Sequence, residues 1–271
     1  MANIEQLQEK AKTIRYEILD MLVGSGSGHP GGSLSATDIV TALYFEEMNL
    51  DPQNPDWEDR DRFVLSKGHA APVLYATLAE KGYFPKEDLG TLRQLGSHLQ
   101  GHPDMKKTPG VDMTTGSLGQ GISAAVGMAL AGQLDEKDYN VYSILGDGEL
   151  QEGQVWEAAL AAVKFGLDNL VGIVDNNRIQ LVGRTEEVMS STMPVVEKFE
   201  SFGWHVIEIN GHDMEEILDA FAKAKEVTGK PVMIVANTVK GKGVSYMEDN
   251  PAWHGKTPGE DKAEQALSEL E

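Results

Sequence analysis

The sequence predicts an α/β fold, a doubly wound and mostly parallel sheet with helices on both faces. Apolar runs with the length of buried strands lie at 141–146, 170–175, 204–209 and 231–237. Helical patterns alternate with them, at 155–166, 192–202 and 213–227. This alternation is typical of parallel strands joined by right-handed helical crossovers. Ligands of such sheets bind where strands end and helices begin, so we expect the functional site at that edge.

The N-terminal part predicts two helices separated by a glycine-rich loop. From Ile4 to Met21, apolar residues recur at three- and four-residue spacing, which predicts an amphipathic helix that ends at the glycines from Gly24. The sequence GSGSGHPGGS then predicts a loop. A second helix is expected from near Ser35 to about Glu47.

The other segments complete a single domain over residues 1–271. A polar loop with two prolines precedes a short buried strand at 63–65, and a loop at 66–69 follows at the carboxyl end of that strand. An Ala-rich helix then runs to about Lys81. From Lys240 onwards Gly, Lys and Pro recur at short intervals, so we expect an irregular arm with a short terminal helix.

Composition excludes several classes of function. The chain of 271 residues is 41% hydrophobic, which suits one globular domain, and it has no cysteine for disulfides or thiolate metal sites. A formal charge of −20 argues against a nucleic-acid surface, which needs clustered Lys and Arg. The N-terminus is too charged for a signal peptide, and no apolar run approaches a membrane span. We therefore expect a cytoplasmic protein in which a metal ion or helix N-termini would hold any bound anion.

Acidic and amide residues follow two of the predicted strands. The segments are YSILGDGELQEG at 142–153 and GIVDNNRIQLVG at 172–183. One strand-helix-strand unit separates Asp147 from Asn177, so parallel pairing puts both at the same edge of the sheet. Either tripeptide alone would be an ordinary tight turn, but their joint occurrence at this spacing favours a ligand site.

These residues suit a magnesium ion that holds a diphosphate. The Asp147 carboxylate, the Asn177 side-chain carbonyl and the Ile179 backbone carbonyl supply three hard oxygen ligands. Two diphosphate oxygens and a water would complete the octahedral shell of Mg²⁺. Gly148 lets the backbone approach phosphate oxygens closely. A G-x-G-x-x-G pattern at 26–31 follows a helix instead of a strand, so it does not predict a dinucleotide site.

With these residues the sequence resembles the transketolase family. The spacing of GDG and NN is similar to the thiamine diphosphate motif, and further segments resemble the first domain of transketolases in the same order. They are GHPGGSLSATDI at 28–39, LSKGHAAPVLYATL at 65–78, GSHLQGHPD at 96–104, TTGSLGQGISAAVGMAL at 114–130 and TVKGKGVSYMEDNPAWHGKTP at 238–258. Ser117 and Asn176 depart from it, because many relatives carry Pro and Asp there.

The resemblance implies a set of ligands. Mg²⁺, for which Ca²⁺ or Mn²⁺ could substitute, would be bound by Asp147, Asn177 and the Ile179 carbonyl. Thiamine diphosphate would lie against His69, Gly116, Leu118, Gly148, Glu149, Asn177 and His254.

The seven histidines divide into two groups. Three are expected to be packed structural residues: His98, His205 and His212. Four lie in loops that contain Gly or Pro: His29, His69, His102 and His254. Neutral imidazoles around a carbonyl substrate can bind hydroxyls and move protons near neutral pH. A zinc site is the alternative, although no pair has the close His-x-x-x-His spacing.

The resemblance assigns these four histidines to catalysis. It implies that His29, His102 and His254 contact the oxygens of the sugar donor, and that His69 and His254 also reach the cofactor phosphates. The reaction implied is transfer of a two-carbon ketol unit from a ketose phosphate to an aldose phosphate, with the cofactor as electron sink.

The resemblance covers only the diphosphate-binding half of the family's active site. In relatives, the glutamate that activates the aminopyrimidine ring comes from the following domain. We therefore expect a second subunit with a pyrimidine-binding domain, in an assembly of two copies of each chain. The alternatives are a subunit of a deoxyxylulose-phosphate synthase or 2-oxo acid dehydrogenase, and a regulatory partner that binds Mg²⁺ and a nucleotide without catalysis.

Overall fold

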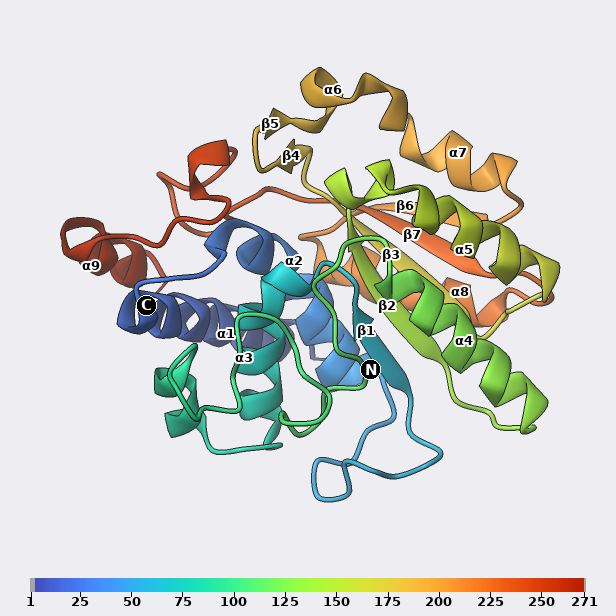
Figure 1. The fold of residues 1–271 in the computed structure, drawn as a ribbon, viewed down its shortest axis with the longest axis horizontal. Helices are drawn as coiled ribbons and strands as arrows, with labels where there is room; N and C mark the ends of the chain where they lie inside the picture. The colour runs from blue at the N-terminus through green and yellow to red at the C-terminus, as the bar shows by residue number, and fades with distance from the viewer. Residues whose placement is uncertain (1–2, 271) are drawn as a thin grey trace.

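A five-stranded parallel sheet forms the centre of the molecule (Figure 1). The computed structural model describes residues 3–270. The strands are β1 (Arg62–Leu65), β2 (Val141–Gly146), β3 (Leu170–Asn176), β6 (His205–Asn210) and β7 (Val232–Asn237). Their order across the sheet is β1-β2-β3-β7-β6, and every pairing is parallel. The predicted fold class and the predicted strands are therefore confirmed.

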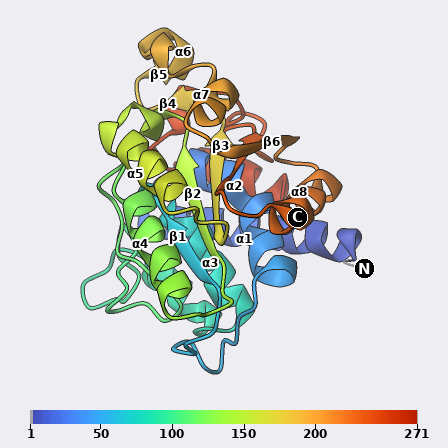
Figure 2. The same cartoon turned by 90° about the vertical axis from the view of Figure 1, so that its right-hand side faces the viewer.

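Helices cover both faces of the sheet (Figure 2). On one face lie α1 (Ile4–Ser25), α2 (Pro30–Ala42), α3 (Ala71–Lys81) and α8 (Met214–Glu226). On the other lie α4 (Gly121–Leu134), α5 (Gly153–Lys164) and α7 (Val195–Ser201). Successive side chains of a strand point to opposite faces of the sheet. In β2, Tyr142 and Ile144 pack with the first group of helices, and Val141 and Leu145 pack with the second.

The second helix begins earlier than the sequence predicts. α2 starts at Pro30, inside the segment predicted to be a loop, and continues after Ala42 as a π-helical turn over Leu43–Glu47. Proline suits the first turn of a helix because its missing N–H would have no partner there. Gly31 is required by packing, since a Cβ at that position would lie 2.9 Å from the Trp253 backbone oxygen.

Several elements were not predicted. The helix α4 is built from small and apolar residues without a polar stripe, so its sequence has no helical periodicity to detect. A two-stranded antiparallel hairpin, β4 (Ile179–Gln180) with β5 (Gly183–Arg184), follows β3 and leads into the short helix α6 (Thr185–Val188). Short 3-10 turns occur at Gly68–Ala70, Lys86–Thr91, Gly148–Gln151, Ser190–Thr192 and Pro251–Trp253.

The C-terminal arm returns to the edge of the sheet where the strands end. After β7 the chain forms turns, the 3-10 turn at Pro251–Trp253 and the helix α9 (Glu260–Ser268). The rings of Tyr246 and Trp253 lie 5.0 Å apart, centroid to centroid, and help to fix the arm. Within residues 3–270, no helix combines the length and apolar character that crossing a membrane requires.

Candidate functional site

A cavity of about 370 Å³ opens at the carboxyl ends of β1, β2 and β3. The start of α2, the loop before α4 and the C-terminal arm complete its walls. The predicted site residues that line it are His29, His69, Gly116, Leu118, Asp147, Gly148, Glu149, Asn177, Ile179 and His254. The volume lies in the range of sites for small molecules and cofactors.

Asp147 lies where β2 ends and begins the 3-10 turn at Gly148–Gln151. Its carboxylate accepts hydrogen bonds from the Gly148 backbone N–H at 2.9 Å and from the Thr185 hydroxyl at 2.8 Å. Burial raises the pKa of Asp147, and the bond from Thr185 opposes that rise. A cation beside this carboxylate would favour its charged form.

Asn177 and Ile179 lie just beyond the end of β3, and Lys240 of the arm reaches them. The Asn177 side-chain carbonyl accepts a hydrogen bond from the Ile179 N–H at 3.1 Å, which forms a tight turn. The Ile179 carbonyl accepts a hydrogen bond from the Lys240 ammonium group at 2.6 Å. Burial lowers the pKa of Lys240 to about 8, and attraction to Asp147 opposes that effect. The Ile179 carbonyl thus faces a positive charge next to Asp147.

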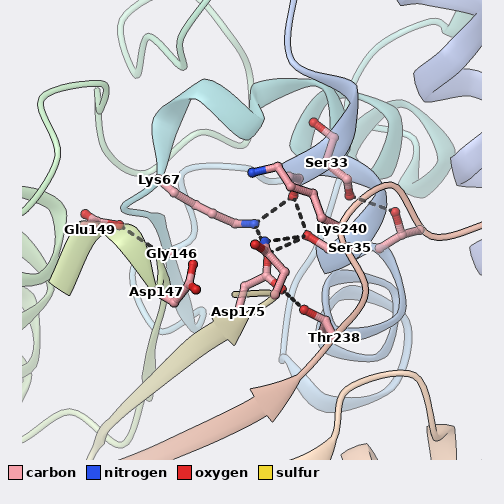
Figure 3. Close-up of polar contacts among 12 residues, drawn as sticks. Ser33, Ser35, Lys67, Gly146, Asp147, Glu149, Asp175, Thr238 and Lys240 are labelled. Atoms are coloured by element: carbon pink, nitrogen blue, oxygen red, sulfur yellow. Dashed lines mark hydrogen bonds and ion pairs between the residues drawn. The ribbon is translucent and has the colours of Figure 1, made fainter. Parts of the chain in front are cut away.

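Lys67 and Asp175 form a buried ion pair beneath the cavity (Figure 3). Their side chains are 2% and 0% exposed, so neither charge is solvated by water. Asp175 also accepts hydrogen bonds from the Ser35 hydroxyl at 2.6 Å, from the Thr238 hydroxyl and from the Asn177 amide at 3.0 Å. Burial alone would raise the pKa of Asp175. The positive charge of Lys67 opposes this most strongly, and the net pKa is lowered. This network fixes the amide of Asn177.

Glu149 holds three loops of the site together. Its carboxylate accepts hydrogen bonds from the Ser66 hydroxyl, from the Gly119 N–H at 2.8 Å and from the Gly146 N–H at 3.1 Å. Burial raises the pKa of Glu149, and these three hydrogen bonds oppose the rise. The carboxylate therefore connects the ends of β1 and β2 with the loop before α4.

Three of the four predicted histidines form a cluster in the wall of the cavity. The ring of His29 lies 5.2 Å from that of His69 and 5.6 Å from that of His254, and the last two are 5.2 Å apart. Burial lowers the pKa of His29 to about 4 and that of His254 to about 3, and it lowers the pKa of His69 well below its usual value. All three rings are neutral near pH 7. The Lys240 ammonium group donates to Nδ1 of His254 at 2.8 Å, which leaves the proton of that ring on Nε2.

His102 lies outside the lining of the cavity, with an exposed side chain. Its ring packs against Gly116, where a Cβ would lie 3.0 Å from the ring. Gly116 has a φ of +146°, which also favours glycine. His102 therefore contacts a residue of the cavity wall.

The three histidines predicted to be structural lie away from the cavity. Nδ1 of His212 is 2.7 Å from the Asp38 carboxylate, and Nε2 of His98 is 3.1 Å from the Asp88 carboxylate. His205 begins β6. Among residues 3–270, no group of three or more His, Asp or Glu side chains is arranged to hold a metal ion.

Three charged residues of the site were missed by sequence reasoning: Lys67, Asp175 and Lys240. Asp175 carried a signal, because a carboxylate at the end of the apolar run GIVD must be paired if the strand is buried. Lys67 had a weaker one, since it follows a short strand in the loop at 66–69. Lys240 had none, because the path of the arm back to the sheet depends on tertiary packing.

The fold and cavity define a parallel α/β domain that binds its ligand where the strands end. Comparison with protein families gives this class a name: the model described as "Transketolase, thiamine diphosphate binding domain" matches residues 6–270. The chain belongs to the transketolase family, of which it contains the thiamine diphosphate-binding domain.

Individual relatives agree with this assignment. The 6-deoxy-6-sulfo-D-fructose transketolase subunit of a Clostridium species is 51% identical, over 98% of this chain and 96% of the relative. An apulose-4-phosphate transketolase subunit from Phocaeicola vulgatus is 43% identical, over 98% and 94%. Human transketolase is also 43% identical, but the match spans only 42% of its length. The transketolase structure from Campylobacter jejuni superposes with a TM-score of 0.93 at 38% identity, over 99% of this chain and 43% of that one.

Proposed function

We propose that this chain is the cofactor-binding subunit of a two-chain transketolase, in which a magnesium ion holds the diphosphate of thiamine diphosphate. The observation that carries the proposal is the convergence of Asp147, Asn177 and Ile179 at the edge of the cavity. These side chains and the Ile179 carbonyl are hard oxygen donors, which Mg²⁺ prefers.

The residues present fit a cation at this place. The Ile179 carbonyl accepts a hydrogen bond from the Lys240 ammonium group, and that group is attracted to the Asp147 carboxylate. The electrostatic environment is therefore suited to positive charge. Asp147, Asn177 and the Ile179 carbonyl would hold the ion, and the buried network of Asp175 keeps the amide of Asn177 in place.

The cavity wall also fits a diphosphate. Lys67 and Lys240 line it and could contact phosphate oxygens, and the carboxylates of Asp147, Glu149 and Glu152 lie in the same wall. At Gly148 a Cβ would lie 3.0 Å from the Gln180 side chain, which is a tighter contact than a Cβ normally makes. When bound, thiamine diphosphate supplies a thiazolium carbon that takes up the electrons of the broken carbon-carbon bond.

The neutral histidines would bind and orient the sugar. A neutral imidazole can donate one hydrogen bond and accept another, so it can hold a hydroxyl or a carbonyl oxygen and move a proton between them. His254 has its proton on Nε2, because Lys240 donates to Nδ1. We assign His29, His102 and His254 to the donor's oxygens, and His69 and His254 to the cofactor phosphates as well.

Substitution of the histidines should separate these roles. His29→Ala and His102→Ala should raise the KM of the donor or lower kcat by about 10-fold or more, with little change in cofactor affinity. His69→Ala should instead weaken binding of the cofactor. Steady-state kinetics and cofactor titrations of the three variants would measure both effects. A variant that released a tightly held zinc ion would favour the zinc alternative.

A partner subunit is part of the proposal. Relatives that this chain matches over 94–96% of their length are named as transketolase subunits. Leu181 lines the cavity, and four large apolar residues of the segment 181–189 are between 39% and 73% exposed: Leu181, Val182, Val188 and Met189. Exposed apolar groups at the rim of a ligand site suit a covering protein surface. We propose a partner with a pyrimidine-binding domain, two copies of each chain in the cytoplasm, and sugar phosphates as substrates.

Calorimetry distinguishes this function from that of a nucleotide-binding regulatory partner. The isolated chain with Mg²⁺ should bind thiamine diphosphate, although weakly without its partner, and should release no binding heat with ATP at the same concentrations. Omission of Mg²⁺ should abolish the heat with thiamine diphosphate. Equal binding of ATP would contradict the proposal.

A further inference from the structure

Arg93 lies in the loop that leads from the 3-10 turn at Lys86–Thr91 to His102. Its φ is +61°, a conformation that residues other than glycine rarely adopt. Its backbone N–H donates to the Leu99 carbonyl at 2.9 Å, which closes the loop between them. Such a conformation persists only where surrounding contacts stabilise it, and it often marks a functional position.

The side chain of Arg93 connects two loops that are far apart in the sequence. Nη1 donates a hydrogen bond to the Ser27 hydroxyl at 2.6 Å. The guanidinium group also lies against Gly101, where a Cβ would be 3.0 Å from Nε and 3.1 Å from Nη2. Ser27 is two residues before His29, and Gly101 directly precedes His102. One guanidinium group therefore contacts both histidine loops.

The charge of Arg93 acts on both rings. Burial has the largest effect in lowering the pKa of His29. The charge of Arg93 has the next largest effect, followed by those of His102 and Lys240. Although His102 is largely exposed, its partial desolvation by the protein is the first cause that lowers its pKa, and the charge of Arg93 is the second. The rings of His69 and His254 also face His29.

Nδ1 of His29 is buried and has no hydrogen-bond partner within residues 3–270.

We propose that Arg93 is a positioning residue for His29 and His102: it fastens their two loops to each other and keeps a permanent positive charge beside both rings. Both rings then stay neutral and correctly spaced for the same substrate. The role of the two histidines rests on the proposed function, but the action of Arg93 on them does not.

Histidine NMR of the isolated chain tests the electrostatic part. The ring signals of His29 and His102, assigned by their loss in His29→Asn and His102→Asn, should titrate below the usual pKa of histidine. Arg93→Met should raise both pKa values by about half a unit or more, because a nearby positive charge is removed. Lys107→Met, which removes an exposed charge from the same region, should leave both values unchanged. Unchanged titration in Arg93→Met would overturn the proposal.

A second variant, which keeps the charge of Arg93, tests whether Arg93 connects the two histidine loops. Ser27→Ala removes only the hydrogen bond to Arg93, so amide exchange should become faster at 27–29 and at 100–102 together. Faster exchange at 27–29 alone would show that the loops are not coupled through Arg93. If Arg93→Met does not fold, Arg93→Lys, which keeps the charge, should leave both pKa values low and still accelerate exchange in both loops. None of these measurements uses a transketolase assay, so their results do not depend on the proposed function.

Discussion

Replacement of Asp147 by Asn should lower the affinity for thiamine diphosphate in the presence of Mg²⁺ by at least about 100-fold, because it removes the one charged protein ligand proposed for the ion. The fold should persist, since the amide oxygen of Asn can still accept the hydrogen bond from the Gly148 N–H, and its NH2 group can donate to the Thr185 hydroxyl, which can also act as an acceptor. Calorimetry of the assembled enzyme gives the affinity, and circular dichroism checks the fold.

Two further variants calibrate this result. Asn177→Ala should have a smaller effect, because it removes a neutral ligand. Asp138→Ala removes an exposed carboxylate elsewhere on the chain and should bind cofactor like the parent. If Asp147→Asn bound the cofactor and Mg²⁺ as tightly as the parent, the proposed metal site would be wrong.

Replacement of Asp175 by Asn should lower the free energy of unfolding by about 3–5 kcal/mol, because it leaves Lys67 charged and buried without a counterion. The substitution keeps the size of the side chain, so the loss comes from the charge. Chemical denaturation followed by circular dichroism measures it. Because Asp175 also holds the amide of Asn177, cofactor affinity should fall as well.

The controls separate a buried pair from an exposed one. Asp219→Asn breaks the surface pair with Lys223, whose side chains are 60% and 59% exposed, and should hardly change the denaturation midpoint. Adding Lys67→Met to Asp175→Asn should recover part of the lost stability, because the uncompensated charge is then gone. A single Asp175→Asn variant as stable as the parent would refute the importance of this pair.

The placement of Asp147 and Asn177 at one edge of the sheet was predictable from the local sequence. Asp147 and Asn177 each follow an apolar run, and parallel pairing brings such positions to one edge whatever the details of packing. The sequence therefore predicts their convergence, and the structure has both in the wall of one cavity.

The charged network was not predictable in the same way. Lys67 and Asp175 are 108 positions apart, and their contact depends on how the loop after β1 lies across β3. The contact of Lys240 with Ile179 likewise depends on the path of the arm. Sequence patterns report the period and the ends of elements, whereas these pairs arise from tertiary packing.

The start of α2 was predicted wrongly, and α4 was not predicted, for a related reason. Gly31 within the first turn of α2 indicates a loop by propensity, but close approach of the arm leaves room only for glycine. The helix α4 lacks the polar stripe that marks a surface helix in the sequence, and contacts with neighbouring elements stabilise it instead. Tertiary contacts decide both cases.

Reconstitution of ketol transfer would show whether this chain is one subunit of a two-chain transketolase. The purified chain would be mixed with the partner subunit that carries a pyrimidine-binding domain, together with Mg²⁺ and thiamine diphosphate, and transfer from ketose phosphates to aldose phosphates would be followed. We expect turnover by the mixture and none by either chain alone. Robust turnover by the 271-residue chain alone would contradict the two-chain assembly, and a reconstituted complex inert toward every ketose donor would contradict the assignment as a transketolase.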